Sequence, residues 1–120
     1  MLSHRYRFHG HGSLRYLYKN SRTARTRSLM LRYTPNKNRV HARFAVIVSK
    51  KVLKSSAKRN RVRRRIYEII RLHQEEIPNS HDYAVTVFSP EMLTMPAQAV
   101  EREVVDLFKQ VRLPDIVKAD

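Results

Sequence analysis

The chain has 120 residues, a length that suits one domain. Its 42% of apolar residues is enough for a modest core, so it is not a disordered basic tail. The absence of cysteine excludes disulfides, thiolate metal sites and a cysteine nucleophile. No apolar run approaches the roughly 18 residues that span a bilayer, and no secretory signal is visible. We expect a single cytoplasmic domain over residues 1–120, with residues 1–12 as a flexible arm and no membrane partner.

The charge is divided unevenly along the chain. The net charge is +15, from 25 Lys and Arg against 10 Asp and Glu. Residues 1–67 hold 20 basic and no acidic residues, whereas residues 68–120 hold 5 basic and 10 acidic residues, so the two parts carry +20 and −5. A polyphosphate neutralises such a density of positive charge and releases counterions as it binds. The pattern favours a nucleic acid over an anionic membrane, because no free-standing helix pairs a basic face with bulky apolar residues.

Hydrophobic periodicity predicts three helices and three strands. In chain order they are a helix at 13–20, strands at 28–34 and 42–49, a helix at 57–76, a strand at 83–88 and a helix at 94–112. The expected N-caps are Ser13, Ser56 and Thr94. The strand at 42–49 is apolar on both faces, which predicts a central place in the sheet. The order is typical of an α+β sandwich, with helices packed on a small sheet of three to four strands.

The two long helices each carry an apolar stripe. The stripe of the first comprises Val62, Ile66, Ile69, Ile70, His73 and Ile77. The stripe of the last comprises Val100, Val104, Leu107, Phe108 and Val111. A helical wheel places Asn60, Arg64 and Tyr67 away from the first stripe. Because His73 falls on that stripe, we expect a hydrogen-bonded core histidine.

A basic run joins the second strand to the long helix. It holds nine Lys or Arg among the sixteen residues 50–65. Positive charge at a helix N-terminus opposes the macrodipole and costs about 0.3–1 kcal/mol per exposed side chain, whereas free N–H groups and basic side chains attract anions. The run therefore predicts binding to RNA phosphates, with a merely solvated helix face as the alternative. The candidate residues are Lys50, Lys51, Lys54, Lys58, Arg59, Asn60, Arg61, Arg63, Arg64 and Arg65.

Protein-based catalysis has little support in the sequence. A metal-dependent nuclease needs clustered carboxylates, and the basic part has none. Glu68 and Glu75 are expected to lie on a solvated surface with local charge pairing. The histidines at positions 4, 9 and 11 are expected to be exposed or close to phosphates rather than metal ligands. We expect no catalytic residue, no protein-bound metal and no cofactor held by the protein alone.

The string from Ser49-Lys50-Lys51 through Arg59-Asn60-Arg61 resembles the signature of the bacterial ribonuclease P protein component. The resemblance covers most of the chain. It implies the α-β sandwich of a ribosomal protein S5 domain, with a left-handed βαβ crossover, an exception to the usual handedness. It also implies a fourth strand. The sequence gives no position for this strand, unless the strand within residues 39–51 is longer than expected or is split into two. The chain departs from the family pattern by one extra residue between Lys51 and Arg59 and by a missing glycine there.

The resemblance also implies a function. In this family a catalytic RNA and Mg²⁺ remove the 5′ leader of precursor tRNA, and the protein is a subunit of this endoribonuclease that needs no further protein partner. The Arg-Asn-Arg helix binds the catalytic RNA, and the leader lies in a cleft between the first helix and the sheet. Candidate leader contacts in this chain are Leu14, Tyr18, Met30, Arg32, Arg59 and Asn60.

Alternatives remain at this point. Core packing is the competing interpretation for Leu14 and Met30. A ribosomal protein or RNA chaperone could carry the same basic helix, and a protein-only nuclease is a weaker possibility because acidic residues are missing from the basic part.

Overall fold

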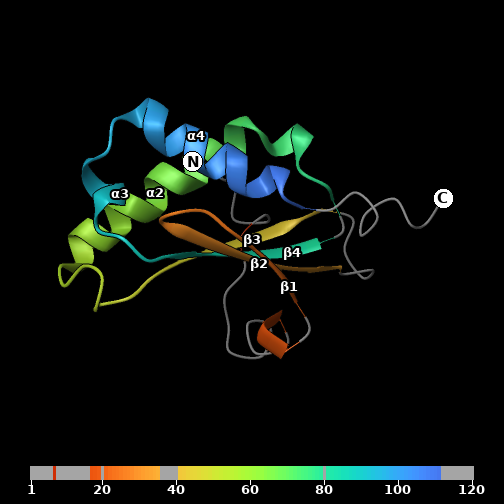
Figure 1. The fold of residues 1–120 in the computed structure, drawn as a ribbon, viewed down its shortest axis with the longest axis horizontal. Helices are drawn as coiled ribbons and strands as arrows, with labels where there is room; N and C mark the ends of the chain where they lie inside the picture. The colour runs from red at the N-terminus through yellow and green to blue at the C-terminus, as the bar shows by residue number, and fades with distance from the viewer. Residues whose placement is uncertain (1–6, 8–16, 20, 36–40, 80, 112–120) are drawn as a thin grey trace.

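A computed structural model describes residue 7 and the ranges 17–19, 21–35, 41–79 and 81–111. The elements are β1 (Arg22–Arg25), β2 (Leu29–Pro35), β3 (Arg43–Val48), α2 (Ser56–Leu72), a short 3₁₀ helix (Gln74–Glu76), β4 (His81–Val87), α3 (Glu91–Thr94) and α4 (Ala97–Lys109). Helices α2, α3 and α4 lie on one side of the sheet (Figure 1). The predicted α+β architecture is confirmed. A helical turn at residues 17–19 lies on the other side, within the predicted first helix.

The four strands form one mixed sheet in the order β1-β2-β4-β3. Strand β2 is antiparallel to β1 and β4, whereas β3 and β4 are parallel neighbours joined through α2. The prediction that β3 is central is wrong, because β3 is the last strand of the sheet. Its two faces are nevertheless covered, since Phe44 and Val46 join the main core while Ala45 packs with Leu17 on the opposite face. A covered edge strand and a central strand thus have the same apolar pattern.

The fourth strand is β1, and the suggestion that residues 39–51 contain it is wrong. Strand β1 precedes β2 and pairs with it from Arg22↔Tyr33 to Arg25↔Met30. Of its four residues only Ala24 is buried. Because an exposed edge strand of four residues shows no apolar alternation, the sequence contains no signal for it.

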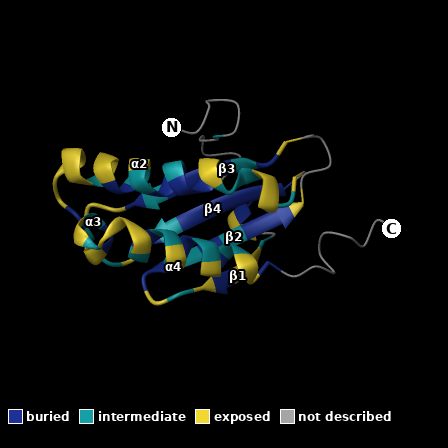
Figure 2. Cartoon of the chain, turned by 90° about the horizontal axis from the view of Figure 1, so that it is seen from above, coloured by how far each residue is buried: buried dark blue, intermediate teal, exposed yellow. Residues whose placement is uncertain are grey.

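The main core lies between the sheet and the inner faces of α2 and α4, where buried positions gather (Figure 2). Both predicted stripes face this core. The prediction for Tyr67 is wrong. The helical wheel placed this residue away from the stripe, but it is buried and only 7% exposed. Its hydroxyl accepts a hydrogen bond from the backbone N–H of Val46 at 3.1 Å. Because α2 packs across β3, the buried face of this helix is wider than the predicted stripe and includes Tyr67. Burial raises the pKa of the Tyr67 hydroxyl.

Two predicted N-caps are corrected. The side chain of Ser55, not Ser56, accepts a hydrogen bond from the backbone N–H of Lys58 at 3.3 Å, so α2 begins one residue earlier than expected. Thr94 ends the short helix α3 instead of capping the last helix. That helix, α4, begins after Pro96, whose fixed φ suits the start of a helix.

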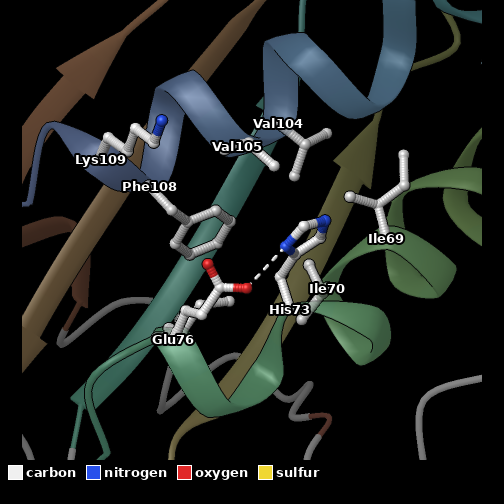
Figure 3. Close-up of a pocket in the computed structure, with 9 residues that line it drawn as sticks. Ile69, Ile70, His73, Glu76, Val104, Val105, Phe108 and Lys109 are labelled. Atoms are coloured by element: carbon white, nitrogen blue, oxygen red, sulfur yellow. Dashed lines mark hydrogen bonds and ion pairs between the residues drawn. The ribbon is translucent and has the colours of Figure 1, made fainter. Parts of the chain in front are cut away.

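The long helix ends at Leu72, before the predicted residue 76, and His73 joins its end to α4. Nδ1 of His73 lies 2.9 Å from Oε2 of Glu76, and Nε2 lies 2.8 Å from Oε2 of Glu101. The hydrogen bonds to Glu101 and Glu76 raise the pKa of His73. The expected hydrogen-bonded histidine is therefore confirmed, although its side chain is 27% exposed at the rim of the core. It also borders a pocket of about 130 Å³ between α2 and α4 (Figure 3).

Candidate nucleic-acid interface

Six cations of the basic run point to solvent around the start of α2. They form no ion pair within the part of the chain that the structure describes, and the first turn of α2 contains no acidic residue. These exposed residues are Lys50, Lys51, Lys54, Lys58, Arg61 and Arg64. Because the helix N-terminus adds its own partial positive charge, the surface strongly favours a polyanion.

Two further members of the run organise this surface. Nη1 of Arg59 donates hydrogen bonds to the backbone oxygens of Leu53 and Lys54, both at 2.9 Å. Arg59 therefore holds the loop between β3 and α2 against the first helical turn. Nη2 of Arg63 donates to Oδ1 of Asn60, so Asn60 fixes a neighbouring arginine. The Asn60 side chain remains exposed.

Arg65 differs from the rest of the run, because its guanidinium is directed into the protein. Nη1 donates to the backbone oxygens of Met92 and Leu93 at 2.9 and 2.8 Å, and Nη2 donates to that of Met95. These carbonyls lie at the end of α3 and just beyond it, where a helix leaves acceptors without partners. Arg65 is also one of the predicted RNA contacts, and in this structure its hydrogen bonds fasten α3 to α2.

The predicted leader residues of β2 lie on the sheet face that the long helices leave uncovered. Leu29, Leu31 and Tyr33 point into the main core, so strand alternation places Met30 and Arg32 on the other face. We call this the open face. Leu17 covers part of it, with its side chain on Ala45 and Ala84.

Tyr18 lies next to Arg32 at this face. Its side chain is 44% exposed, and Cζ of Arg32 lies 4.9 Å from the centroid of its ring. Met30 is two residues from Arg32 on the same strand face and is half-buried. The structure thus brings three of the predicted leader residues together: an aromatic ring, a cation and an apolar side chain.

The other leader candidates are not part of this group. Leu14 lies outside the described residues. Arg59 and Asn60 are on α2, which packs on the opposite side of the sheet from Tyr18 (Figure 1). Any contact of these two residues with a nucleic acid therefore belongs to the surface at the start of α2.

Sequence analysis missed a second contact between an arginine and an aromatic ring. Cζ of Arg25 lies 5.2 Å from the centroid of the Phe88 ring, which is 42% exposed. Phe88 was assigned to the predicted strand at 83–88, but β4 ends one residue before it. No signal pointed to Arg25 because β1 itself was not expected.

Carboxylates and histidines are the side chains in this protein that could hold a metal ion. Among the described residues, no group of three or more His, Cys, Asp and Glu side chains could hold a metal ion. No helix in the described ranges is both long and apolar enough to cross a membrane. Glu68 forms the expected local charge pair, since Arg71 Nη2 lies 2.5 Å from its Oε2 and lowers the pKa of Glu68 to about 2. The histidines at positions 4, 9 and 11 lie outside the described residues.

Comparison with known proteins identifies the relatives of this chain. The model of the family described as Ribonuclease P matches residues 2–112. The ribonuclease P protein component of Staphylococcus haemolyticus is 31% identical over 106 residues, which cover 87% of this chain and 90% of that protein. The component from a Synechocystis species is 29% identical over 99 residues, which cover 82% of this chain and 79% of that one.

Solved structures show the same fold. The RNase P protein of Staphylococcus aureus matches with a TM-score of 0.80 at 23% identity, covering 90% of this chain and 96% of that one. The RNase P protein of Thermotoga maritima matches with a TM-score of 0.80 at 18% identity, covering 88% and 97%. The family model and the relative from Staphylococcus haemolyticus each match most of the chain, including the basic run, so the chain belongs to the ribonuclease P protein family.

Proposed function

We propose that this protein is the protein subunit of ribonuclease P, that it binds the catalytic RNA through the start of α2, and that it binds the 5′ leader of precursor tRNA on the open face. The observation that carries this proposal is the group of six exposed cations around the first turns of α2. Family membership supports the role as a subunit.

Binding of the catalytic RNA follows from electrostatics. The six cations have no acidic neighbour in the first turn of α2, so they repel one another and the helix dipole in the free protein. RNA phosphates relieve this repulsion, and the released counterions make the affinity depend on salt. If all six contact phosphates, the logarithm of the affinity should fall with the logarithm of salt concentration with a slope of roughly −5.

Binding of the leader follows from the exposed Tyr18 ring. A base that stacks on an aromatic side chain contributes about 1–3 kcal/mol, and stacking tolerates any base. Arg32 beside the ring adds a cation for the adjoining phosphate. Such a contact suits a single strand of variable sequence, and mature tRNA, which lacks a leader, would not make it.

The chemistry of cleavage is assigned to the RNA and its Mg²⁺ ions. The first 67 residues contain 20 Lys and Arg, which suit the binding of phosphates. They contain no carboxylate that could hold a metal ion or act as a general base. Its contribution is therefore to position the leader and the catalytic RNA.

The assembly surface is tested with two double variants that remove equal charge. Arg61→Ala with Arg64→Ala should weaken binding to the catalytic RNA and reduce the magnitude of the salt slope by about two. Arg102→Ala with Lys109→Ala, on the exposed side of α4, is the control and should leave the slope unchanged. Equal effects of the two pairs would show that only net charge matters and would contradict the assignment.

The leader site is tested in the reconstituted ribonucleoprotein. Tyr18→Ala should weaken binding of precursor tRNA by about 1–3 kcal/mol and leave mature tRNA unaffected. An equal loss for both RNAs would contradict a leader contact. A protein that binds precursor and mature tRNA alike, and does not stimulate leader removal, would instead be a general RNA-binding protein.

A further inference from the structure

The open face carries a second exposed aromatic ring. Phe88 follows the last residue of β4, and the guanidinium of Arg25 from β1 lies over its ring. The backbone N–H of Phe88 donates to the oxygen of Ser28 at 2.8 Å, which continues the pairing of β4 with the chain before β2 by one step. Val87 points into the core, so alternation places Phe88 on the open face.

The strand register separates this ring from Tyr18. Arg32, which contacts Tyr18, pairs with Ala84, and Phe88 lies four residues further along the chain from Ala84. At 3.3 Å per residue this is about 13 Å along the strand. One single strand of a few nucleotides can cross that distance, so two bases of the same strand can occupy the two rings.

The charge around Phe88 indicates the chemistry of its ligand. Arg25 and Arg27 are both exposed at the β1–β2 turn. In the described strands the open face carries one carboxylate, Asp82, which Arg43 holds in a bidentate ion pair with both distances at 2.9 Å. Asp82 lies six residues from Phe88, near the other end of β4. An exposed ring next to two cations, on a face whose carboxylate is already paired, suits a base and its phosphate better than an apolar protein surface.

The backbone beneath Arg25 is held in place by α4. Gln110 accepts from the Arg25 N–H at 3.3 Å and donates to the Arg25 oxygen at 2.6 Å. Oε2 of Glu103 accepts from the Thr26 hydroxyl at 2.6 Å and from the Ser28 N–H at 2.8 Å. Because the turn is fixed before any ligand arrives, binding there has a smaller ordering cost.

We propose that Phe88 and Arg25 form a second stacking site for an unpaired base of single-stranded RNA, separate from the site at Tyr18. The proposal rests on the proposed function for the identity of that strand, which is the leader of precursor tRNA. The base stacks on the exposed part of the Phe88 ring, and Arg25 supplies a cation for the adjoining phosphate.

The test measures binding of precursor tRNAs that differ only in leader length to the reconstituted ribonucleoprotein. Phe88→Leu keeps an apolar side chain but removes the aromatic ring, so it should weaken binding of long leaders by roughly 5-fold or more. Phe88→Tyr keeps the ring and should bind like the unchanged protein. Leu72→Ala is the control, because Leu72 is also apolar and 59% exposed but lies at the end of α2.

Leader length separates this site from the first one. The losses caused by Phe88→Leu and Tyr18→Ala should begin at different leader lengths and should add in the double variant. A Phe88→Leu protein with unchanged affinity for every leader would overturn the second site, and Phe88 would then be a candidate contact for another protein. Loss of mature tRNA binding to the same extent would also overturn it. If Tyr18→Ala has no effect on any leader, the proposed function fails at its first site, whatever Phe88→Leu does.

Discussion

Arg64 and Arg65 are adjacent on α2 but have different surroundings, and their alanine variants should fail in different ways. Arg64 is exposed and forms no ion pair with described residues, whereas Arg65 donates to three backbone oxygens near α3. Arg64→Ala should weaken RNA binding and leave the free energy of unfolding nearly unchanged. Arg65→Ala should lower the free energy of unfolding and have a smaller effect on the salt dependence of RNA binding.

The size of the Arg65 effect follows from its contacts. A hydrogen bond from a charged donor contributes about 1.5–3 kcal/mol. Here one half-buried guanidinium serves three acceptors, and water can replace part of what is lost, so we expect about 2–3 kcal/mol in total. For a domain of this size that corresponds to a fall in Tm of roughly 8–12 °C. Arg65→Met, which keeps most of the apolar stem, isolates the contribution of the guanidinium.

Urea unfolding followed by far-UV circular dichroism measures the free energy of unfolding. RNA affinity across a salt series measures the salt dependence of binding. RNA binding is measured well below the Tm of the weakest variant, so that every protein is folded. The reasoning is refuted if Arg65→Ala unfolds at the same urea concentration as Arg64→Ala and reduces the salt slope as much.

Two further predictions concern stability. Tyr67→Phe removes the acceptor of the buried Val46 N–H and should cost about 1–3 kcal/mol in urea unfolding; an unchanged midpoint would show that water replaces the hydroxyl. Glu101 and Glu76 raise the pKa of His73 above 6.5, so the stabilisation from His73 is fully present below pH 6.5 and is lost as the pH rises through the raised pKa. Glu101→Gln should flatten this dependence in unfolding measurements at a series of pH values, and an equally steep dependence would exclude the contact as its cause.

Local patterns in the sequence were sufficient to predict the helices and strands that bury one regular face. Strand β2 alternates Leu29, Leu31 and Tyr33 toward the core, and α2 repeats its apolar residues with helical spacing. These periods follow from backbone geometry alone, so neither depends on what lies opposite. The basic run was equally visible, because a stretch of 67 residues without an acidic residue is a property of the sequence itself.

The tertiary structure decided which of these residues face solvent and which strands pair. The helical wheel places Arg64 away from the apolar stripe, but it does not show that Arg65 turns inward, because the carbonyls of Met92 to Met95 that bind Arg65 are 27 to 30 residues away. Strand β1 exists because β2 and a turn held by Glu103 of α4 give its backbone a partner, not because its side chains form a pattern. Hydrogen-bond partners distant in the sequence leave no local period, and for this reason the sequence predicted the basic surface while the fold selected the arginines that remain on it.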